Sequence, residues 1–251
     1  MSRRIELTAR DRSPGLIDAS PWRLDDWLKS SADSIARLAV DTAEGPAGRL
    51  GDFFRIRTRE VSTATPEWVF SGDCRHLHSL GHEHQVGRLI VDGDAGDYCG
   101  SCMLAGAIEI RGTAGDFLAA PTGSRGVGMR GGKLSVQGDV GRAAGFRMRR
   151  GSLSIAGDAG NQLGTCMVAG TIVCEGSIGS EWATGMRRGT LVLSQEPPPR
   201  SSAAFTPPRR LNSPFVSVWS GGRLDSVMVR RGDRRVGGIG EIWTPITTAA
   251  T

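Results

Sequence analysis

The chain repeats one sequence unit six times between Gly72 and Leu193. The usual spacing is 19 residues, and the units begin at Gly72, Gly93, Gly112, Gly138, Gly157 and Gly176. Counted back from the start of the next unit, the ninth position holds Met103, Met129, Met148, Met167 and Met186, with His84 in the first unit. Five of the seven methionines in the chain therefore share one repeat position, which no chance distribution would produce.

Glycines and apolar pairs accompany each methionine. The sixth position back is always glycine: Gly87, Gly106, Gly132, Gly151, Gly170 and Gly189. Positions four and two back are apolar: Leu89 and Val91, Ile108 and Ile110, Leu134 and Val136, Leu153 and Ile155, Ile172 and Cys174, Leu191 and Leu193. This alternation is the period of a β-strand, and fixed glycines supply turns with positive φ.

A unit of this size cannot bury its own inner face, so the units must stack. The pattern predicts an all-β fold, a parallel β-helix with one coil per repeat and about 4.8 Å between coils. Methionine is unbranched and fills irregular gaps, so the repeat methionines should line the inside. The left-handed hexapeptide helix needs an apolar residue every six positions, and 19 is not a multiple of six, so we reject it.

The repeats divide the chain into three predicted segments. Residues 1–48 are expected to form an N-terminal leader or cap with a short helix, residues 49–194 the β-helix, and residues 195–251 a C-terminal extension that starts with a proline-rich linker. One unit is long, because Gly112 and Gly138 are 26 residues apart. The extra residues lie within 117–125, and insertions in solenoids often mark the binding face.

Local patterns predict the elements that flank the repeats. Residues 5–9 have the composition of a strand, and Ser20 followed by Pro21 is typical of a helix start. Leu24, Trp27 and Leu28 would share one face of that helix. Further strands are predicted at 50–57, 67–71, 215–219 and 226–230.

The charge of the chain comes almost entirely from arginine. Of its 31 basic residues 29 are arginine, and the isoelectric point is near 9.3. Such a chain favours acidic partners, but no nucleic-acid recognition motif is present, so we expect no nucleic-acid partner. No apolar run approaches the ~18 residues of a membrane span, and the N-terminus lacks the apolar stretch of a signal peptide. We expect a cytoplasmic protein without a membrane partner.

Histidines and cysteines offer two candidate metal or redox sites. His76, His78, His82 and His84 lie within nine residues and could hold zinc. His84 occupies the methionine position, so it should point inward and His82 the other way, which favours a polar first coil without metal. Cys99 and Cys102 form a CxxC pair, but a single pair is weak evidence. The odd total of five cysteines indicates reduced thiols.

Acidic and basic residues recur at fixed repeat positions. Asp73, Asp94, Asp139 and Asp158 follow the first glycine of their units, where stacked carboxylates could suggest a glycosidase. Ordinary turn chemistry explains them better, so we predict no catalytic residue in this chain. The candidate contact residues directly follow the repeat methionine or lie one position further: Arg130, Arg149, Arg150, Arg187 and Arg188. Like charges in one ladder repel, so either an anionic ligand, an acidic partner or solvent must offset them.

The pattern GxxGxxxGxxMxxGx[IL]x[VI] resembles the glycine-motif β-helix of two families. One is the C-terminal domain of the glutamate synthase large chain. The other is the β-helical subunit of formylmethanofuran dehydrogenase, with its relative in the bacterial formyltransferase/hydrolase complex. Residues 50–54, the long unit 115–136 and the ending 232–242 resemble the second family. The sequence departs from the pattern at His84, and at Ala183, where a glycine is usual and its loss should only relax a corner.

The resemblance implies a right-handed β-helix in a complex of one-carbon metabolism. In the bacterial branch the complex moves a formyl group from tetrahydromethanopterin to a methanofuran-type carrier and then releases formate. Catalysis lies in amidohydrolase-like and formyltransferase sister subunits, with zinc in a sister subunit and no cofactor in this chain. The carrier's polyglutamate tail is a candidate ligand for the arginines. A redox formylmethanofuran dehydrogenase subunit and a glutamate synthase accessory domain are the alternatives, and the arginine-rich composition favours the bacterial complex.

Overall fold

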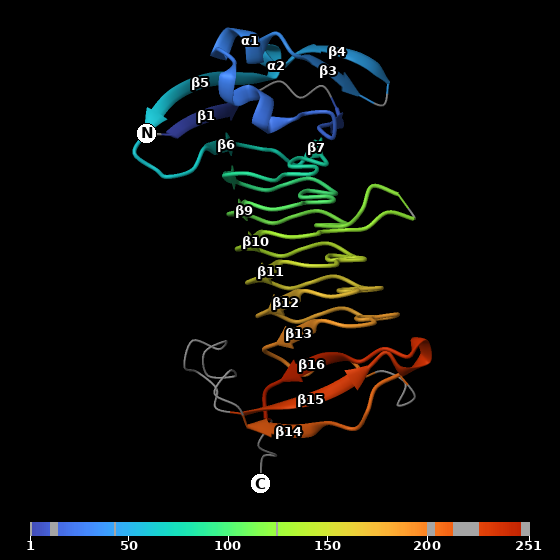
Figure 1. The fold of residues 1–251 in the computed structure, drawn as a ribbon. Helices are drawn as coiled ribbons and strands as arrows, with labels where there is room; N and C mark the ends of the chain where they lie inside the picture. Colours follow the sequence, from blue (N-terminus) through green and yellow to red (C-terminus); the bar gives the residue numbers. More distant parts are fainter. Residues whose placement is uncertain are drawn as a thin grey trace.

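The computed structural model describes residues 2–10, 15–42, 44–123, 125–199, 204–212 and 226–246. It is an all-β structure dominated by one large sheet with the strand order β14-β15-β16-β13-β12-β11-β10-β9-β8-β6-β1-β5 (Figure 1). The N-terminal elements lie at one end of the stack and the C-terminal strands at the other. The predicted all-β class and its mostly parallel sheet are confirmed.

The repeats supply the parallel centre of this sheet. Their strands are β8 (Arg88–Asp92), β9 (Ala107–Ile110), β10 (Lys133–Val136), β11 (Ser152–Ile155), β12 (Thr171–Cys174) and β13 (Thr190–Leu193). β6 (Glu67–Ser71) lies directly before the first unit and pairs in parallel with β8. Equivalent residues pair in register, so Leu134 lies between Ile108 and Leu153. Each strand therefore lies directly over the equivalent strand of the previous repeat.

Strands from outside the repeats extend both ends of the sheet. β1 (Ser2–Ala9) pairs in parallel with β6, and β16 (Gly240–Thr244) pairs in parallel with β13. Antiparallel strands then finish the sheet, β5 (Phe54–Val61) beyond β1, and β15 (Ser226–Gly232) and β14 (Arg209–Asn212) beyond β16. Both outermost strands carry exposed arginines, which oppose edge-to-edge pairing of sheets.

A second, small sheet and short helical turns complete the structure. The small sheet has the order β4 (Gly45–Arg49), β3 (Ala39–Thr42), β2 (Ile17–Asp18) and β7 (Leu77–His78). The helical turns are η1 (Leu24–Lys29), α1 (Ala32–Ala36), α2 (Leu50–Phe53) and η2 (Arg234–Val236). No helix in the described ranges is long and apolar enough to cross a bilayer.

Successive repeats are joined at two further places along each unit. A ladder of parallel bridges runs through Cys74, Ala95, Ala114, Val140, Ala159 and Ile178. A third set of hydrogen bonds joins the turns after the methionines, as where Arg149 N–H donates to the Met129 carbonyl at 2.8 Å. The chain therefore returns to the same positions in each unit and not only in the strands.

The predicted inner row is confirmed. Met103, Met129, Met148, Met167 and Met186 are all fully buried. Each methionine tip lies under the glycine of the following coil: a Cβ added to Gly151 would be 2.8 Å from Met129 Cε, and one added to Gly170 would be 2.9 Å from Met148 Cε. The glycine and the methionine recur together because the methionine tip fills the space that the glycine, which has no side chain, leaves open.

A run of left-handed residues precedes each methionine. In the Met148 coil, Ala143, Gly145 and Arg147 have φ angles of +57°, +68° and +55°. Ala183 keeps the same conformation at φ +51° and is fully buried. The expectation that its corner would relax is therefore wrong: hydrogen bonds to the neighbouring coil, including Ala183 N–H to the Leu163 carbonyl at 2.7 Å, hold the alanine in a conformation that glycine would adopt more easily.

Two predicted flanking elements differ in the structure. The helix expected from Ser20 begins only at Leu24, because the Ser20 N–H and hydroxyl both bond the Asp18 carboxylate and form a turn. The strand predicted at 50–57 starts with the helical turn α2, because the Asp52 carboxylate accepts the Arg49 N–H at 2.8 Å and caps it. The predicted strand at 67–71 is β6, and the one at 226–230 lies within β15. The one at 215–219 lies outside the described residues.

Candidate functional site

The candidate arginines lie at the turns that follow Met129, Met148 and Met186. We call this row the methionine corner; its members are Leu104, Arg130, Arg149, Val168, Arg187 and Ile239, the last of which lies level with Arg188 in the register of β13 and β16. Backbone bonds hold the row in order, since Arg130 N–H donates to the Met103 carbonyl at 2.7 Å and Ile239 N–H donates to the Arg187 carbonyl at 2.8 Å. Arg150 and Arg188 lie one position further along the same turns, and all five arginines are exposed.

The row of charge is interrupted by apolar side chains. Arg130 and Arg149 are on neighbouring coils, but Val168, 37% exposed, separates Arg149 from Arg187. Ile239, 63% exposed, lies in the next coil level with Arg188. The methionine corner is thus a mixed surface of guanidinium groups and exposed aliphatic side chains, and not a continuous basic strip.

These arginines differ from others on the surface in their ion pairs. Arg111 pairs with Asp92 and Glu109 at 3.0 and 3.1 Å, and Arg142 pairs with Asp116 at 2.9 Å. Within the described part of the chain, Arg130, Arg149, Arg150, Arg187 and Arg188 form no ion pair. Their guanidinium groups keep all their donors for solvent, a ligand or another protein.

The carboxylates of the turn aspartates accept hydrogen bonds from backbone N–H groups. The carboxylates of Asp94, Asp139 and Asp158 each accept an N–H from the next coil at 2.7–2.8 Å. A second set does the same, in which Asp97 accepts from Asp116 N–H and Asp116 from Arg142 N–H. Both rows join one coil to the next, so hydrogen bonds between coils, and not the local turn bonds expected from the sequence, occupy these carboxylates.

Asp139 gives a direct test of that structural role. We expect Asp139→Ala to lower the free energy of unfolding by about 1–2 kcal/mol, since the Asp158 N–H loses a charged acceptor. Asp139→Asn keeps an amide oxygen in the same place and should cost less than about 0.5 kcal/mol. Urea unfolding followed by circular dichroism measures both. Equal losses in the two variants would mean that the charge matters and the hydrogen bond does not.

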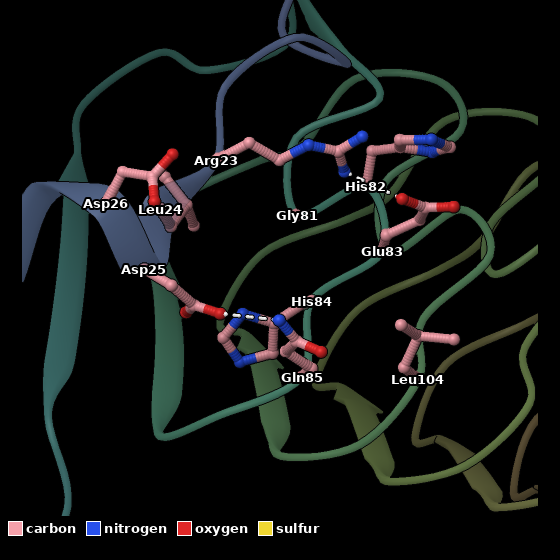
Figure 2. Close-up of a pocket in the computed structure, with 10 residues that line it drawn as sticks. All are labelled: Arg23, Leu24, Asp25, Asp26, Gly81, His82, Glu83, His84, Gln85 and Leu104. Atoms are coloured by element: carbon pink, nitrogen blue, oxygen red, sulfur yellow. Dashed lines mark hydrogen bonds and ion pairs between the residues drawn. The ribbon is translucent and has the colours of Figure 1, made fainter.

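The histidines do not converge on one point. His84 is 4% exposed in the methionine position, as predicted, while His82 Nδ1 lies 2.8 Å from Ser101 Oγ and its ring points elsewhere (Figure 2). His78 Nε2 lies 3.9 Å from Asp97. Burial lowers the pKa of His76, His82 and His84. In the described ranges no three histidine, cysteine, aspartate or glutamate side chains are placed to hold a metal ion.

The cysteines are free thiols, as the sequence predicted. Burial raises the pKa of Cys74 and Cys99 to about 12 and that of Cys174 to about 11. A thiol with so high a pKa carries almost no thiolate at neutral pH, and thiolate is the reactive form. These three cysteines therefore serve as apolar filler.

The long coil brings aromatic residues together that the sequence analysis did not single out. The Tyr98 and Phe117 rings stack at 4.8 Å on neighbouring coils, and the Arg142 guanidinium lies 5.0 Å from the centre of the Phe117 ring. Tyr98 also lines a cavity of about 750 Å³ together with Trp22 and with Gly123 of the insertion. The stack could have been foreseen, because Tyr98 and Phe117 occupy the same repeat position 19 residues apart.

The chain is similar to known proteins both in sequence and in structure. Residues 78–200 match the GXGXG motif family. A solved chain of the formyltransferase/hydrolase complex (FhcABCD) from Methylorubrum extorquens, determined with methylofuran, has a similar structure with a TM-score of 0.72. The predicted resemblance is confirmed. The two chains are 25% identical, and the match covers 96% of this chain and 99% of that one. No curated protein matches the sequence.

The likeness to the formyltransferase/hydrolase chain extends well beyond the repeats. The motif match ends at residue 200, whereas the structural match includes nearly all of both chains. The N-terminal elements and the C-terminal strands β14–β16 are therefore part of the resemblance. This extent distinguishes the relationship from one that rests on a shared repeat alone.

Proposed function

We propose that this chain is a noncatalytic structural subunit of a formyltransferase/hydrolase complex and is built as a right-handed parallel β-helix with a cap at residues 1–48 and an extension at 195–251. The complex would transfer a formyl group from tetrahydromethanopterin to a methanofuran-type carrier and release formate. The observation that carries the proposal is the match over 96% and 99% of the two chains. A glutamate synthase accessory domain would share the repeat without the flanking elements.

Sister subunits would hold the catalytic residues and the zinc. The turn carboxylates support this role because they accept backbone N–H groups, and the buried thiols support it because they are unreactive. We expect the purified chain alone to show no formyl transfer or hydrolysis and no stoichiometric metal. Activity assays and metal analysis check this expectation. Stoichiometric zinc that disappears on mutation of His76 and His78 would overturn it.

Affinity purification of the tagged chain from its own cells tests complex membership. Co-purification of an amidohydrolase-like subunit and a formyltransferase subunit is the expected result. A molybdenum or tungsten protein in their place would indicate a formylmethanofuran dehydrogenase, and a glutaminase or flavoprotein synthase would indicate a glutamate synthase. Recovery of the chain without any partner would contradict the proposal.

The unpaired arginines would bind carboxylates in that complex. Guanidinium groups pair bidentately with carboxylates, and each exposed pair contributes only about 0.2–1 kcal/mol, so several must act together. A polyglutamate tail of the carrier is one source of carboxylates, and an acidic face of a sister subunit is the other. The exposed Val168 and Ile239 within the methionine corner favour the acidic face of a sister subunit over the polyglutamate tail. A protein face can cover aliphatic side chains, whereas a chain of carboxylates gains little from contact with them.

A triple variant separates the two sources. In Arg130→Gln, Arg149→Gln, Arg187→Gln we expect the complex to dissociate. High salt should weaken the unaltered complex in the same way, because it screens the ion pairs that the variant lacks. A raised apparent KM for the carrier in an intact complex would instead identify the tail as the ligand. The matched control replaces Arg10, Arg37 and Arg57, which are exposed and form no ion pair among the described residues, and removes the same charge elsewhere. If the control has an equal effect, net charge is responsible and neither assignment holds.

A further inference from the structure

The turn between β15 and β16 presents two aliphatic side chains to solvent. Val236 is 50% exposed and Ile239 is 63% exposed. The large hydrophobic side chains that are exposed among the described residues are Leu16, Leu38, Val86, Val168, Val236 and Ile239. Single exposed hydrophobic residues are ordinary on a protein surface, whereas residues that gather at one place mark an interaction site. We call residues 233–239 the anchor turn.

The anchor turn is held firmly against the last coil of the repeats. Asp233 is buried, and its carboxylate accepts the Arg235 guanidinium at 2.6 Å and the Gly185 N–H at 3.1 Å. The Gly238 N–H donates to the Asp233 carbonyl at 2.8 Å, and the Asp233 N–H donates to the Met186 carbonyl at 2.9 Å. The turn thus closes the β15–β16 hairpin at the C-terminal end of the stack (Figure 1). A surface that is already ordered loses less entropy when it binds a partner.

The charges beside the anchor turn indicate what kind of molecule covers it. Arg187, Arg188 and Arg234 are exposed and form no ion pair among the described residues. A second copy of this chain would bring the same arginines together, and like charges across an interface cost several kcal/mol. Val168, from the coil before Arg187, adds a further exposed aliphatic side chain. The combination fits a different protein, with an apolar centre and acidic residues around it.

We propose that the anchor turn docks into an apolar pocket of a sister subunit, where Val236 and Ile239 are covered and carboxylates at the rim pair with the neighbouring arginines. The inference rests on the proposed function, because the complex supplies the sister subunit. Apolar side chains at the centre of an interface carry most of its binding energy. Exposed ion pairs contribute less and mainly guide the partners into register.

Purification of the tagged chain from its own cells, with the double variant Val236→Asn, Ile239→Asn, tests the proposal. Both side chains are exposed, so the variant should fold, which circular dichroism checks. We expect the recovery of sister subunits to fall about tenfold or more relative to the unaltered chain. The matched control is Leu16→Asn, Val86→Asn, which makes the same kind of change at two exposed positions in the N-terminal part of the structure and should keep the sister subunits.

The possible outcomes separate this inference from the proposed function. If the unaltered chain recovers no sister subunit, both fail. If the unaltered chain and the anchor-turn variant recover sister subunits equally, only the inference fails. An equal loss in the control would also overturn it, because the position of the apolar residues would then not matter.

Sedimentation of the purified chain tests the remaining occupant. We expect a monomer. Self-association that disappears in the double variant would identify a second copy as the occupant and overturn the assignment to a sister subunit. If the double variant does not fold, Ile239→Asn alone carries the test, because Ile239 is the more exposed of the two side chains.

Discussion

Replacing Met148 by aspartate is expected to prevent folding at neutral pH. Met148 is fully buried in the middle of the inner row, with Met129 and Met167 in the adjacent coils. Its tip packs under Gly170 of the following coil, so a carboxylate there would have no water and no cationic partner. An unpaired buried charge costs several kcal/mol, which is a large part of the stability of a typical domain.

The control for this experiment is Met148→Leu, which keeps an apolar side chain of similar volume and should cost less than about 1.5 kcal/mol. Circular dichroism and urea unfolding compare the two. Any folded Met148→Asp protein should lose stability as the pH rises above about 4, because burial raises the pKa of the carboxyl in the folded state only. Stability equal to that of the leucine variant at pH 7 would show that the inner row is not packed as described.

Replacing Gly151 by alanine should lower the free energy of unfolding by about 3 kcal/mol or more. Gly151 has φ +90°, and an added Cβ would lie 2.7 Å from the Gly132 carbonyl oxygen and 2.8 Å from Met129 Cε. A methionine tip can move, but the carbonyl belongs to the ladder that joins the two coils, since Ser152 N–H donates to it. The clash can be relieved only by separating the coils.

Gly237→Ala separates backbone strain from crowding. Gly237 also has a positive φ, +66°, but an added Cβ would meet no atom within 4 Å. Its replacement should cost about 1 kcal/mol, the penalty of a left-handed alanine alone. The difference between the two variants in urea unfolding measures the crowding between coils. Equal losses would mean that the glycine is needed only for its conformation.

Much of the fold could be predicted because the same residue types recur at the same positions of several repeats. The spacing of Gly151 from Met148 and of Leu153 from Ile155 recurs in the other units, so strand, turn and inward position follow from one alignment of the chain with itself. The flanking segments occur once. Whether residues 50–53 extend or turn depended on a single carboxylate, that of Asp52, and the alternation in β1 does not say that β6 and β5 are its partners.

The candidate site was predicted only as a set of positions. The sequence places Arg130, Arg149 and Arg187 at one repeat position, but it does not show that Arg111 and Arg142 find acidic partners while these three do not. Ion pairs depend on which side chains reach across neighbouring coils, and the aliphatic neighbours Val168 and Ile239 give the methionine corner its mixed character.

The sequence by itself determined the stacked units, the buried methionine row and the register of its strands, because a periodic pattern of side-chain size and backbone freedom allows few arrangements. The tertiary structure alone decided what the N-terminal segment packs against, and therefore that Asp25 and His84 line one cavity. These two residues are 59 positions apart and no periodicity relates them. Their meeting depends on the free energy of the whole packed end of the molecule, which no local pattern encodes.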